Sequence, residues 1–412
     1  MQAADLRTLL ADADANRRCI LVPAAHDAMS ATLAARAGCR VVFMSGFAVS
    51  ASKLALPDAG LISYGEQLEV GRCICEATHN QILVIGDGDT GFGSAANMRR
   101  TLKGYALAGF AGITIEDQSF PKRCSYARGV QVEARDAAIA RVRSAIAARD
   151  EMRAADGLDL VVRRDAACRR ATPPFPATRP TVTSRQIVAR TDVRNAASGG
   201  GLAEAIARCR AFASLGADVV YAEGIRDASE LARLADALPG GTRKMLAQVE
   251  RPGSSLISPS EAGALGFSLS LMGLSVFSVA MRAMKQALRT MASGGLPPAD
   301  DGMPLDELYE EVGFPAHYEW EARFEPGAPR QAGRTAASGE RRAAVAAAAA
   351  AAAHEEEGEG EGDEPVLDEE EAGGGADETP ADEAAARAAR IEQAVLKGRS
   401  ARRAVELRAG RY

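Results

Sequence analysis

Two carboxylates stand in the glycine-rich segment 86–93, directly after the apolar run at residues 82–85. A strand that ends here would expose Asp87 and Asp89 where glycines let the backbone turn sharply. Carboxylate oxygens with room for water and substrate suit a hard divalent cation such as Mg²⁺. Two alternatives remain for this segment. It also matches G-x-G-x-x-G, although two acids oppose the binding of a pyrophosphate, and Asp and Gly are common in surface turns.

Three further groups of residues suit the same chemistry. They are Glu116-Asp117-Gln118, Lys122-Arg123-Cys124 and Ala189-Arg190-Thr191-Asp192. Acids that hold a metal, together with Lys and Arg that bind anions, predict a divalent metal and a small anionic substrate at the mouth of a barrel.

Short β-branched runs alternate with longer amphipathic runs between residues 19 and 292. The expected strands are 19–23, 40–44, 82–87, 112–116, 187–190, 219–223, 244–248 and 267–272. The expected helices between them are 28–37, 66–78, 95–108, 134–149, 202–215, 228–237, 260–265 and 276–292, preceded by 5–13. This alternation predicts an α/β fold, a (β/α)₈ TIM barrel. An open doubly wound sheet with a lid is the alternative.

The barrel predicts where the active site lies, because polar residues at the carboxyl ends of barrel strands face the catalytic centre. Six expected strands end at or just before a polar residue, namely Ser45, Asp87, Glu116, Arg190, Glu223 and Gln248. This alignment indicates an enzyme.

Length and composition exclude several classes of protein. The chain has 412 residues, of which 47% are hydrophobic, without an apolar run long enough to cross a membrane and without a signal peptide. Seven scattered cysteines favour a reducing compartment over a disulfide framework. The net charge of −6 comes from residues 355–371, which hold eleven acids and no base; the remainder has 49 basic and 44 acidic residues. Interleaved charges argue against binding of nucleic acid.

Two regions do not follow the barrel pattern. Residues 161–186 are rich in Arg, Pro and Thr and form an atypical insert in the domain that spans residues 1–325. Near-duplicate segments, 161–165 and 188–192, flank the insert, and the second is assigned to the strand because a helix follows it promptly. We interpret the insert as a retained intron or gene-model artefact. Residues 326–412 include poly-alanine and an acidic run, which predicts a disordered, low-complexity tail.

The ordered motifs resemble those of the phosphoenolpyruvate mutase/isocitrate lyase superfamily. The similar segments are Val22-Pro23-Ala24-Ala25-His26-Asp27-Ala28, Phe43-Met44-Ser45-Gly46-Phe47, Leu56-Pro57-Asp58, residues 87–93, Gly112-Ile113-Thr114-Ile115-Glu116-Asp117-Gln118, Pro121-Lys122-Arg123-Cys124, Ala189-Arg190-Thr191-Asp192, Tyr221-Ala222-Glu223 and residues 320–324. The resemblance covers residues 18–324 apart from the insert. Within the superfamily the chain is most similar to the 2-methylisocitrate lyase-like and carboxyvinyl-carboxyphosphonate phosphorylmutase-like proteins.

The resemblance implies a role for each site residue. Asp87 would ligate Mg²⁺, or Mn²⁺ in its place, and Asp58, Asp89 and Glu116 would reach the ion directly or through water. Ser45, Gly46 and Phe47 would hold a substrate carboxylate, and Arg190 would bind or polarise the substrate. Glu223 and Gln248 are expected beside the substrate.

Cys124 favours a lyase within the superfamily, because the lyase cysteine is thought to protonate the product carbanion. Lys122 and Arg123 are available to lower the pKa of the thiol. The chain departs from the lyase pattern at Ser125-Tyr126, which replaces Gly-His, and also at Phe43, at Gln248 and at Arg251-Pro252. These changes concern substrate recognition more than the metal site.

The resemblance implies a magnesium-dependent carbon–carbon lyase that acts on a 2-hydroxy di- or tricarboxylate and releases pyruvate or a similar oxo acid. The alternatives are an oxaloacetate hydrolase or decarboxylase, a phosphonomutase, and a non-catalytic relative with an interaction tail. The resemblance also implies a homotetramer that exchanges the last barrel helix, at about residues 276–292. No nucleic acid or membrane partner is expected. The expected location is the cytoplasm, or an organelle if an N-terminal extension is missing.

Overall fold

A computed structural model describes residues 6–79, 81–156, 186–197, 199–250, 256–298 and 301–324. The predicted tail lies outside these residues, as do Arg251-Pro252 and all of the predicted insert except Gln186. None of the helices in these ranges is both long enough and apolar enough to cross a membrane.

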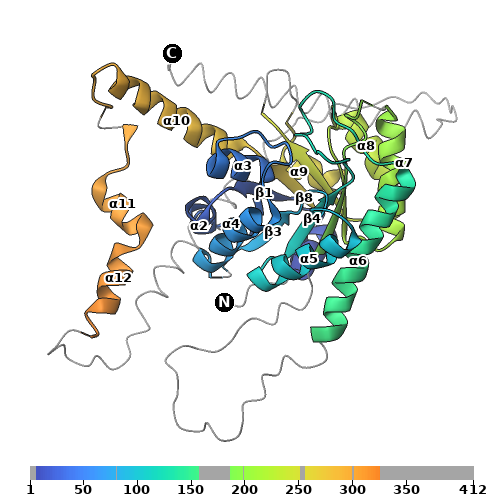
Figure 1. The fold of residues 1–412 in the computed structure, drawn as a ribbon, viewed down its shortest axis with the longest axis horizontal. Helices are drawn as coiled ribbons and strands as arrows, with labels where there is room; N and C mark the ends of the chain where they lie inside the picture. Colours follow the sequence, from blue (N-terminus) through green and yellow to red (C-terminus); the bar gives the residue numbers. More distant parts are fainter. Residues whose placement is uncertain are drawn as a thin grey trace, which may run out of the picture. The chain divides into compact units, whose positions relative to one another are not determined.

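Eight parallel strands close into a barrel in the order in which they occur in the sequence (Figure 1). They are β1 (Ile20–Ala25), β2 (Val41–Met44), β3 (Leu83–Asp87), β4 (Gly112–Glu116), β5 (Gln186–Thr191), β6 (Val219–Ala222), β7 (Lys244–Gln248) and β8 (Leu269–Met272). The barrel closes where β1 pairs with β8, with Ile20 opposite Leu269. The predicted (β/α)₈ fold is confirmed, and the second of the two near-duplicate segments forms β5.

Helices alternate with the strands. They are α1 (Leu6–Ala15), α2 (Ala28–Arg36), α3 (Gly46–Leu54), α4 (Tyr64–Ala77), α5 (Ala95–Ala108), α6 (Arg135–Asp156), α7 (Gly201–Ser214), α8 (Ala228–Ala237), α9 (Pro259–Ala264), α10 (Ser275–Ala292), α11 (Leu305–Val312) and α12 (Phe314–Glu321). Every helix expected from the sequence is present, with ends shifted by at most two residues except in α6, which ends at Asp156, seven residues beyond the expected end. The helices α3, α11 and α12 were not predicted.

Local signals fix the beginnings of several helices. Ser63 and Glu66 form a capping box at α4, in which each side chain accepts a hydrogen bond from the other residue's backbone N–H. Asp27 caps α2 in the same way with Ser30. Such caps satisfy N–H groups that have no intrahelical acceptor.

The amino-terminal end of the barrel is closed by apolar packing. Leu6, Leu9 and Leu10 of α1 belong to one buried cluster with strand residues such as Val41 and Leu269, which stand at or near the starts of their strands. Packing of this kind leaves the opposite, carboxyl end of the barrel for polar side chains.

The described chain separates into two compact units that divide within α10. The first unit holds the barrel and the residues up to Ala280. The second begins at Met281 and includes the rest of α10 together with α11 and α12.

Candidate active site

The six polar residues predicted at strand ends all stand at the carboxyl end of the barrel. Asp87, Glu116 and Gln248 are the last residues of β3, β4 and β7, Ser45 and Glu223 follow β2 and β6 directly, and Arg190 is the penultimate residue of β5. Five of the six are buried, and the side chain of Arg190 is 12% exposed. Charges held this far from water interact strongly with one another.

Lys122 lies inside the group of acids that the sequence assigned to a metal. Its side chain is 3% exposed, and its Nζ is 2.8 Å from Oδ1 of Asp58 and in contact with Oδ1 of Asp89. Asp87 accepts a hydrogen bond of 3.1 Å from the backbone N–H of Asp89. The loop that carries Cys124 therefore supplies a cation to Asp58, which follows α3, and to Asp89, which follows β3.

Burial dominates the electrostatics of these acids. It raises the pKa of Asp89 to about 6, although Lys122 opposes the shift, and it raises the pKa of Glu116 well above its ordinary value. Burial alone would lower the pKa of Lys122, but the surrounding carboxylates outweigh it and raise that pKa. The site is thus rich in acids that lack sufficient positive charge.

The donor set fits a hard divalent cation. Both carboxylate oxygens of Glu116 are buried without a hydrogen-bond donor in the described chain, and Arg190 approaches Oε2 only to 3.4 Å. No three His, Cys, Asp or Glu side chains among the described residues form a ready coordination group in this conformation. Mg²⁺ keeps several waters and takes only one or two carboxylates, so Asp87, Asp89, Asp58 and Glu116 have suitable chemistry.

The helix α3 begins directly against Asp87. The Oγ of Ser45 caps the helix by accepting a hydrogen bond of 3.3 Å from the N–H of Ala48. A Cβ atom on Gly46 would lie 2.7 Å from Oδ2 of Asp87, so only glycine lets the helix start so close to this carboxylate. The first-turn N–H groups of a helix bind anions, which suits the predicted role of Ser45, Gly46 and Phe47.

Arg190 is held in place mainly by Asp192. Its Nε and Nη2 donate to the two carboxylate oxygens of Asp192 at 3.0 and 2.8 Å, and Nη2 also donates to Oγ of Ser125. Glu223 lies 3.7 Å from Nη2, and the ring centroid of Tyr221 lies 5.4 Å from Cζ. The guanidinium is therefore held at the carboxyl end of β5 by residues from the Cys124 loop and from the ends of β5 and β6.

Cys124 lies on the loop of residues 119–128, which is tied down on its amino-terminal side. Gln118 accepts a hydrogen bond from the N–H of Arg123 and donates one to its carbonyl oxygen, both of 2.9 Å. Burial raises the pKa of the Cys124 thiol, although Arg190 and Lys122 oppose the shift. Lys122 therefore acts on this pKa in the expected direction, but desolvation outweighs the nearby cations, so the pKa of the thiol is raised and not lowered as expected.

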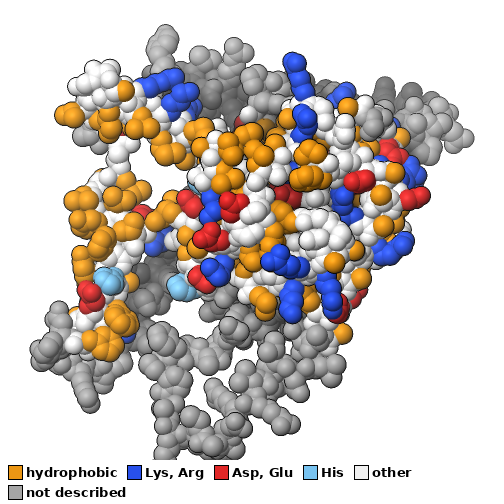
Figure 2. Space-filling view, in the orientation of Figure 1, with side chains coloured by type: hydrophobic (Ala, Val, Ile, Leu, Met, Phe, Trp, Pro, Cys, Tyr) orange, Lys and Arg blue, Asp and Glu red, His pale blue; other side chains and the backbone are white. Residues whose placement is uncertain are grey.

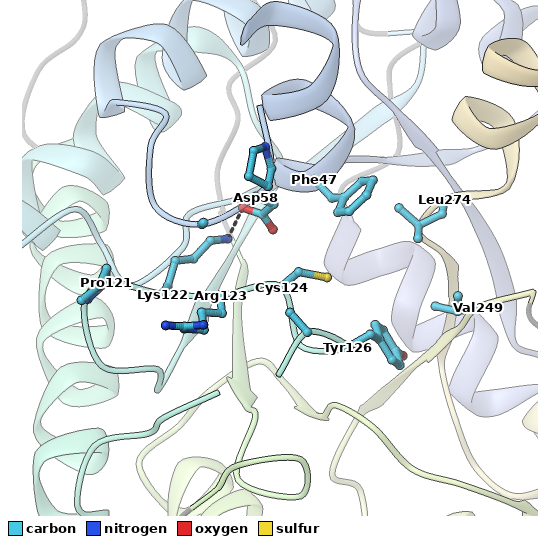
Figure 3. A pocket seen from close by; sticks show the side chains of 12 residues that line it. Phe47, Asp58, Pro121, Lys122, Arg123, Cys124, Tyr126, Val249 and Leu274 are labelled. Carbon is cyan, nitrogen blue, oxygen red and sulfur yellow. Dashed lines mark ion pairs between the residues drawn. The ribbon is translucent and has the colours of Figure 1, made fainter. Parts of the chain in front are cut away.

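A cavity of about 620 Å³ opens beside Cys124 (Figure 3). Asp58 and Lys122 border it on one side, while Phe47, Val249, Leu274 and the ring of Tyr126 border it on the other, with the Cys124 sulfur between the two sides. Asp87, Glu116 and Arg190 do not line this cavity. The cavity therefore meets the buried charges only through Asp58 and Lys122.

Two of the predicted substrate contacts are engaged within the protein. The amide of Gln248 pairs with the backbone of Ile257 at 2.9 and 2.8 Å and donates to Ser270 at 2.9 Å. The carboxylate of Glu223 accepts hydrogen bonds from Tyr126, Tyr221 and the N–H of Gly224. Their predicted contact with substrate stays a prediction.

Sequence reasoning gave no site role to a second layer of residues. Asp117 accepts a hydrogen bond of 2.9 Å from the N–H of Asp192, and its other oxygen pairs with Arg208 at 2.8 Å. The sequence contains Asp117 and Asp192 within its quoted motifs, but Arg208 stands on α7 without any local signal. Side chains that orient ligating or substrate-binding groups matter nearly as much as those groups.

Comparison with known proteins identifies relatives of the whole barrel. The profile of the family described as phosphoenolpyruvate phosphomutase matches residues 10–178 and 176–292. The chain is 32% identical over 309 residues to the chloroplastic carboxyvinyl-carboxyphosphonate phosphorylmutase of Arabidopsis thaliana, an alignment that covers 74% of this chain and 80% of the relative.

Two further relatives are named as lyases. The 2,3-dimethylmalate lyase of Eubacterium barkeri is 31% identical over 282 residues, which cover 68% of this chain and 83% of the relative. The 2-methylisocitrate lyase of Halalkalibacterium halodurans is 28% identical over 298 residues, which cover 71% and 85% of the two chains.

Solved structures agree with these relatives. Oxaloacetate acetylhydrolase bound to the inhibitor 3,3-difluorooxalacetate superposes with a TM-score of 0.65 at 28% identity, covering 78% of this chain and 96% of its own. Phosphonopyruvate hydrolase in complex with oxalate and Mg²⁺ superposes with a TM-score of 0.61 at 25% identity, covering 79% and 100%.

Proposed function

Because the chain belongs to the phosphoenolpyruvate mutase/isocitrate lyase superfamily, we propose that it is a metal-dependent carbon–carbon lyase. Its substrate would be a small 2-hydroxy di- or tricarboxylate, and its products would include pyruvate or a related 2-oxo acid. The single observation that carries this proposal is the position of the Cys124 sulfur in a cavity, between Asp58 and Lys122 on one side and an apolar surface on the other. Two relatives named as lyases support it.

The residues at the carboxyl end of the barrel would have separate roles in binding the metal ion and the substrate. Asp87 would hold Mg²⁺, or Mn²⁺ in its place, and Asp58, Asp89 and Glu116 would reach the ion directly or through water. The bound ion would stabilise the negative charge that develops on the substrate oxygens. The start of α3 would receive one carboxylate, and Arg190 would bind another or polarise the 2-oxo group as it forms.

Cleavage of the carbon–carbon bond leaves a carbanion stabilised by the adjacent carboxylate, and this carbon must then receive a proton. Cys124 supplies it: burial keeps the thiol protonated near neutral pH, and its sulfur lies between the two sides of the cavity. A general acid of this kind contributes about 10²- to 10⁴-fold to the rate.

The apolar side of the cavity supports a substrate that carries an alkyl group. Phe47, Val249 and Leu274 surround the space on the far side of Cys124 from Asp58. A methyl group buried there gains about 0.8 kcal/mol, whereas a carboxylate loses its hydration. A substituted malate, such as the substrate named for the Eubacterium barkeri relative, therefore suits this surface better than a tricarboxylate.

Turnover measured by NMR tests the proposal. Purified protein with Mg²⁺ is incubated in turn with 2,3-dimethylmalate, 2-methylisocitrate, oxaloacetate and phosphonopyruvate. We expect cleavage of a hydroxy acid to pyruvate, a loss of about 10²-fold or more in Cys124→Ala, and no activity in Asp87→Ala. Lyase activity that survives in Cys124→Ala would refute the role of the thiol. Intact Mg²⁺ binding without turnover of any substrate would favour the non-catalytic alternative.

Hydrolysis of an oxo dicarboxylate is the second candidate. It is favoured by the likeness to oxaloacetate acetylhydrolase in complex with a difluorinated oxaloacetate. The same acids and Arg190 would hold such a substrate, and water would attack its 2-oxo carbon. The bond to the acetate carbon would then break, and this carbon would receive a proton that comes from the attacking water and not from Cys124. Release of oxalate and acetate from oxaloacetate, unaffected by Cys124→Ala, would select this candidate.

We also propose that the protein is a homotetramer that exchanges α10 between copies. Val276, Met284, Leu288 and Met291 form an exposed apolar stripe along this helix, at the spacing of one helical face. In the space-filling view, hydrophobic side chains gather along α10 and also along α11 and α12 (Figure 2). The location in cytoplasm or organelle stays a prediction, and the chloroplastic relative supports an organelle.

A further inference from the structure

Two hydroxyl groups tie the Cys124 loop to the barrel on the carboxyl-terminal side of the thiol. The first belongs to Ser125, which is buried. Its Oγ donates to Oδ1 of Asp192 and accepts a hydrogen bond from Nη2 of Arg190, while its carbonyl oxygen accepts one of 3.2 Å from Asn195. Ser125 therefore joins the loop to the group that fixes Arg190 at the end of β5.

The second hydroxyl belongs to Tyr126. Its Oη donates a hydrogen bond of 2.6 Å to Oε1 of Glu223, just beyond β6, and its ring lines the cavity. Glu223 is itself held by Tyr221 and by the N–H of Gly224. The phenol is thus anchored on a rigid acceptor, and hydrogen bonds to a charged carboxylate are among the stronger ones.

We propose that Ser125 and Tyr126 are positioning residues, which fix the Cys124 thiol and Arg190 relative to each other through their hydroxyl groups. The catalytic role of these two residues rests on the proposed lyase function, whereas the hydrogen bonds that position the thiol and Arg190 do not depend on it. Gln118 holds the loop before Cys124, and the two hydroxyls hold it afterwards. With both sides tied, the sulfur stays half-buried beside the apolar side of the cavity.

Loss of either hydroxyl removes one of the attachments that hold this short loop on the carboxyl-terminal side of Cys124. Asp192 still holds Arg190 in Ser125→Ala, since the Nε bond of 3.0 Å and the Nη2 bond of 2.8 Å remain. The thiol gains water in both variants, which exposes its sulfur and also favours the thiolate, the reactive form. Both effects raise the rate at which a small alkylating agent modifies Cys124.

Alkylation kinetics test the proposal without any requirement for catalysis. Full-length protein is treated with iodoacetamide, and modification of each cysteine is followed by peptide mass spectrometry. We expect Cys124 to react about tenfold faster in Ser125→Ala and in Tyr126→Phe, the size of effect that follows loss of one hydrogen bond to a charged group. Cys75 and Cys209, both buried, report on unfolding and should stay unmodified.

Matched variants control for the loss of a hydroxyl elsewhere. Tyr64→Phe removes a hydroxyl that reaches the carbonyl oxygen of Arg100 at 3.4 Å, and Ser214→Ala removes one at the end of α7. Both should leave the Cys124 rate unchanged. Wild-type rates at Cys124 in Ser125→Ala and Tyr126→Phe would overturn the proposal, as would equal acceleration at Cys75 and Cys209.

Turnover separates this proposal from the proposed function. If the wild type cleaves a hydroxy acid, Tyr126→Phe should lower kcat about tenfold with little change in KM, because the phenol contacts Glu223 rather than Arg190. Ser125→Ala should also raise KM, since Ser125 contacts Arg190. A KM change alone in Tyr126→Phe would contradict the proposal. Faster alkylation in protein that turns over no substrate would refute the lyase and leave the positioning role intact.

Discussion

At the scale of single residues, the site is governed by how little water reaches its charges. Desolvation comes first among the influences on Asp89, Glu116 and Cys124, and in each it raises the pKa. Because buried carboxylates are poorly solvated, a nearby cation would stabilise the charged form of Asp89 and Glu116. For the thiol, a raised pKa preserves the proton that the carbanion of the proposed lyase reaction would need, because a thiolate would have none to give.

Gly46 offers a sharp test of the acid cluster. In Gly46→Ala the new Cβ would lie 2.7 Å from Oδ2 of Asp87, so the carboxylate must turn away. We expect Mg²⁺ affinity to fall by about tenfold, as for other changes that disturb the orientation of a ligand. Isothermal titration with Mg²⁺, or Mn²⁺ binding followed by electron paramagnetic resonance, measures this directly.

Gly65→Ala on α4 is the matched control. The added Cβ there would have only Ser63 Oγ nearby, at 3.9 Å, which is ordinary contact. This variant should bind Mg²⁺ like the wild type. Equal metal affinity in Gly46→Ala and Gly65→Ala would mean that Asp87 is not a ligand, or that its carboxylate moves at no cost.

Sequence patterns predicted well which residues lie near the site, but they predicted less well which partners those residues contact there. Asp87, Glu116 and Arg190 were predictable, because parallel strands bring their carboxyl ends to one edge. Lys122 was expected beside the thiol and instead pairs with Asp58 and Asp89. The direction of a loop side chain depends on contacts far apart in sequence, which no local periodicity encodes.

At the scale of elements, the helix α3 is the most informative element that the sequence analysis did not predict. A barrel of eight repeats needs only one helix after each strand, and after β2 the helix at residues 66–78 already met that need. Residues 46–54 also begin with glycine and mix Ser, Ala and Val without a clear apolar face, so no helix was expected there. The capping serine was identified only as a strand-end residue. Recognition of Ser45 as an N-cap would have predicted both the helix and its anion-binding end.

The helices α6 and α7 brace the second layer behind the site. Glu204 pairs with Arg135 at the start of α6 and with Arg208, at 2.9 Å, on its own helix. Arg208 in turn holds Asp117, which accepts from the N–H of Asp192. The position of Arg190 therefore depends on contacts that begin on the outer helices.

Glu204→Gln should lower stability in a manner that depends on pH. Hydrogen bonding to Arg135 lowers the pKa of Glu204 from its ordinary 4.5 to about 2. The carboxylate therefore stabilises the fold fully above about pH 4.5, and this contribution disappears as the pH falls towards 2. We expect a loss of about 1 to 2 kcal/mol in the free energy of unfolding at pH 7, allowing for water at this partly exposed side chain.

Urea unfolding at pH 7 and at pH 3.5 measures the difference, which should be smaller at the lower pH. Glu76→Gln, on a side chain that is 71% exposed beside Arg72, is the control and should change stability by less than about 0.5 kcal/mol at either pH. A loss in Glu204→Gln that grows as the pH falls would contradict the assigned ion pairs.

At the scale of the whole molecule, the barrel was the most predictable feature. Eight repeats of strand and helix are a global pattern, which survives errors at individual boundaries such as that of β8, which begins at Leu269 rather than residue 267. The apolar residues of α11 and α12, including Leu305, Tyr309 and Trp320, are exposed in the described chain. Large exposed apolar surfaces mark places of association.

The double variant Met284→Glu, Leu288→Glu tests that association. Charges on the apolar stripe of α10 should convert a tetramer into smaller species, because a buried carboxylate without a partner is strongly unfavourable. Light scattering after size-exclusion chromatography gives the mass. Gln286→Glu, on the opposite side of α10, should retain the wild-type mass. A monomeric wild type at micromolar concentration would refute the exchange of α10.

Lys122 has a consequence for how the protein would acquire the proposed metal ion. A buried acid cluster without a counter-ion would resist folding, yet here the chain brings its own ammonium group to Asp58 and Asp89. The barrel should therefore fold before a metal ion binds. A chelator should then abolish the proposed activity without unfolding the protein. Occupancy of the site would then follow the free magnesium of its surroundings, so that activity, rather than the amount of folded protein, reports the local supply of the ion.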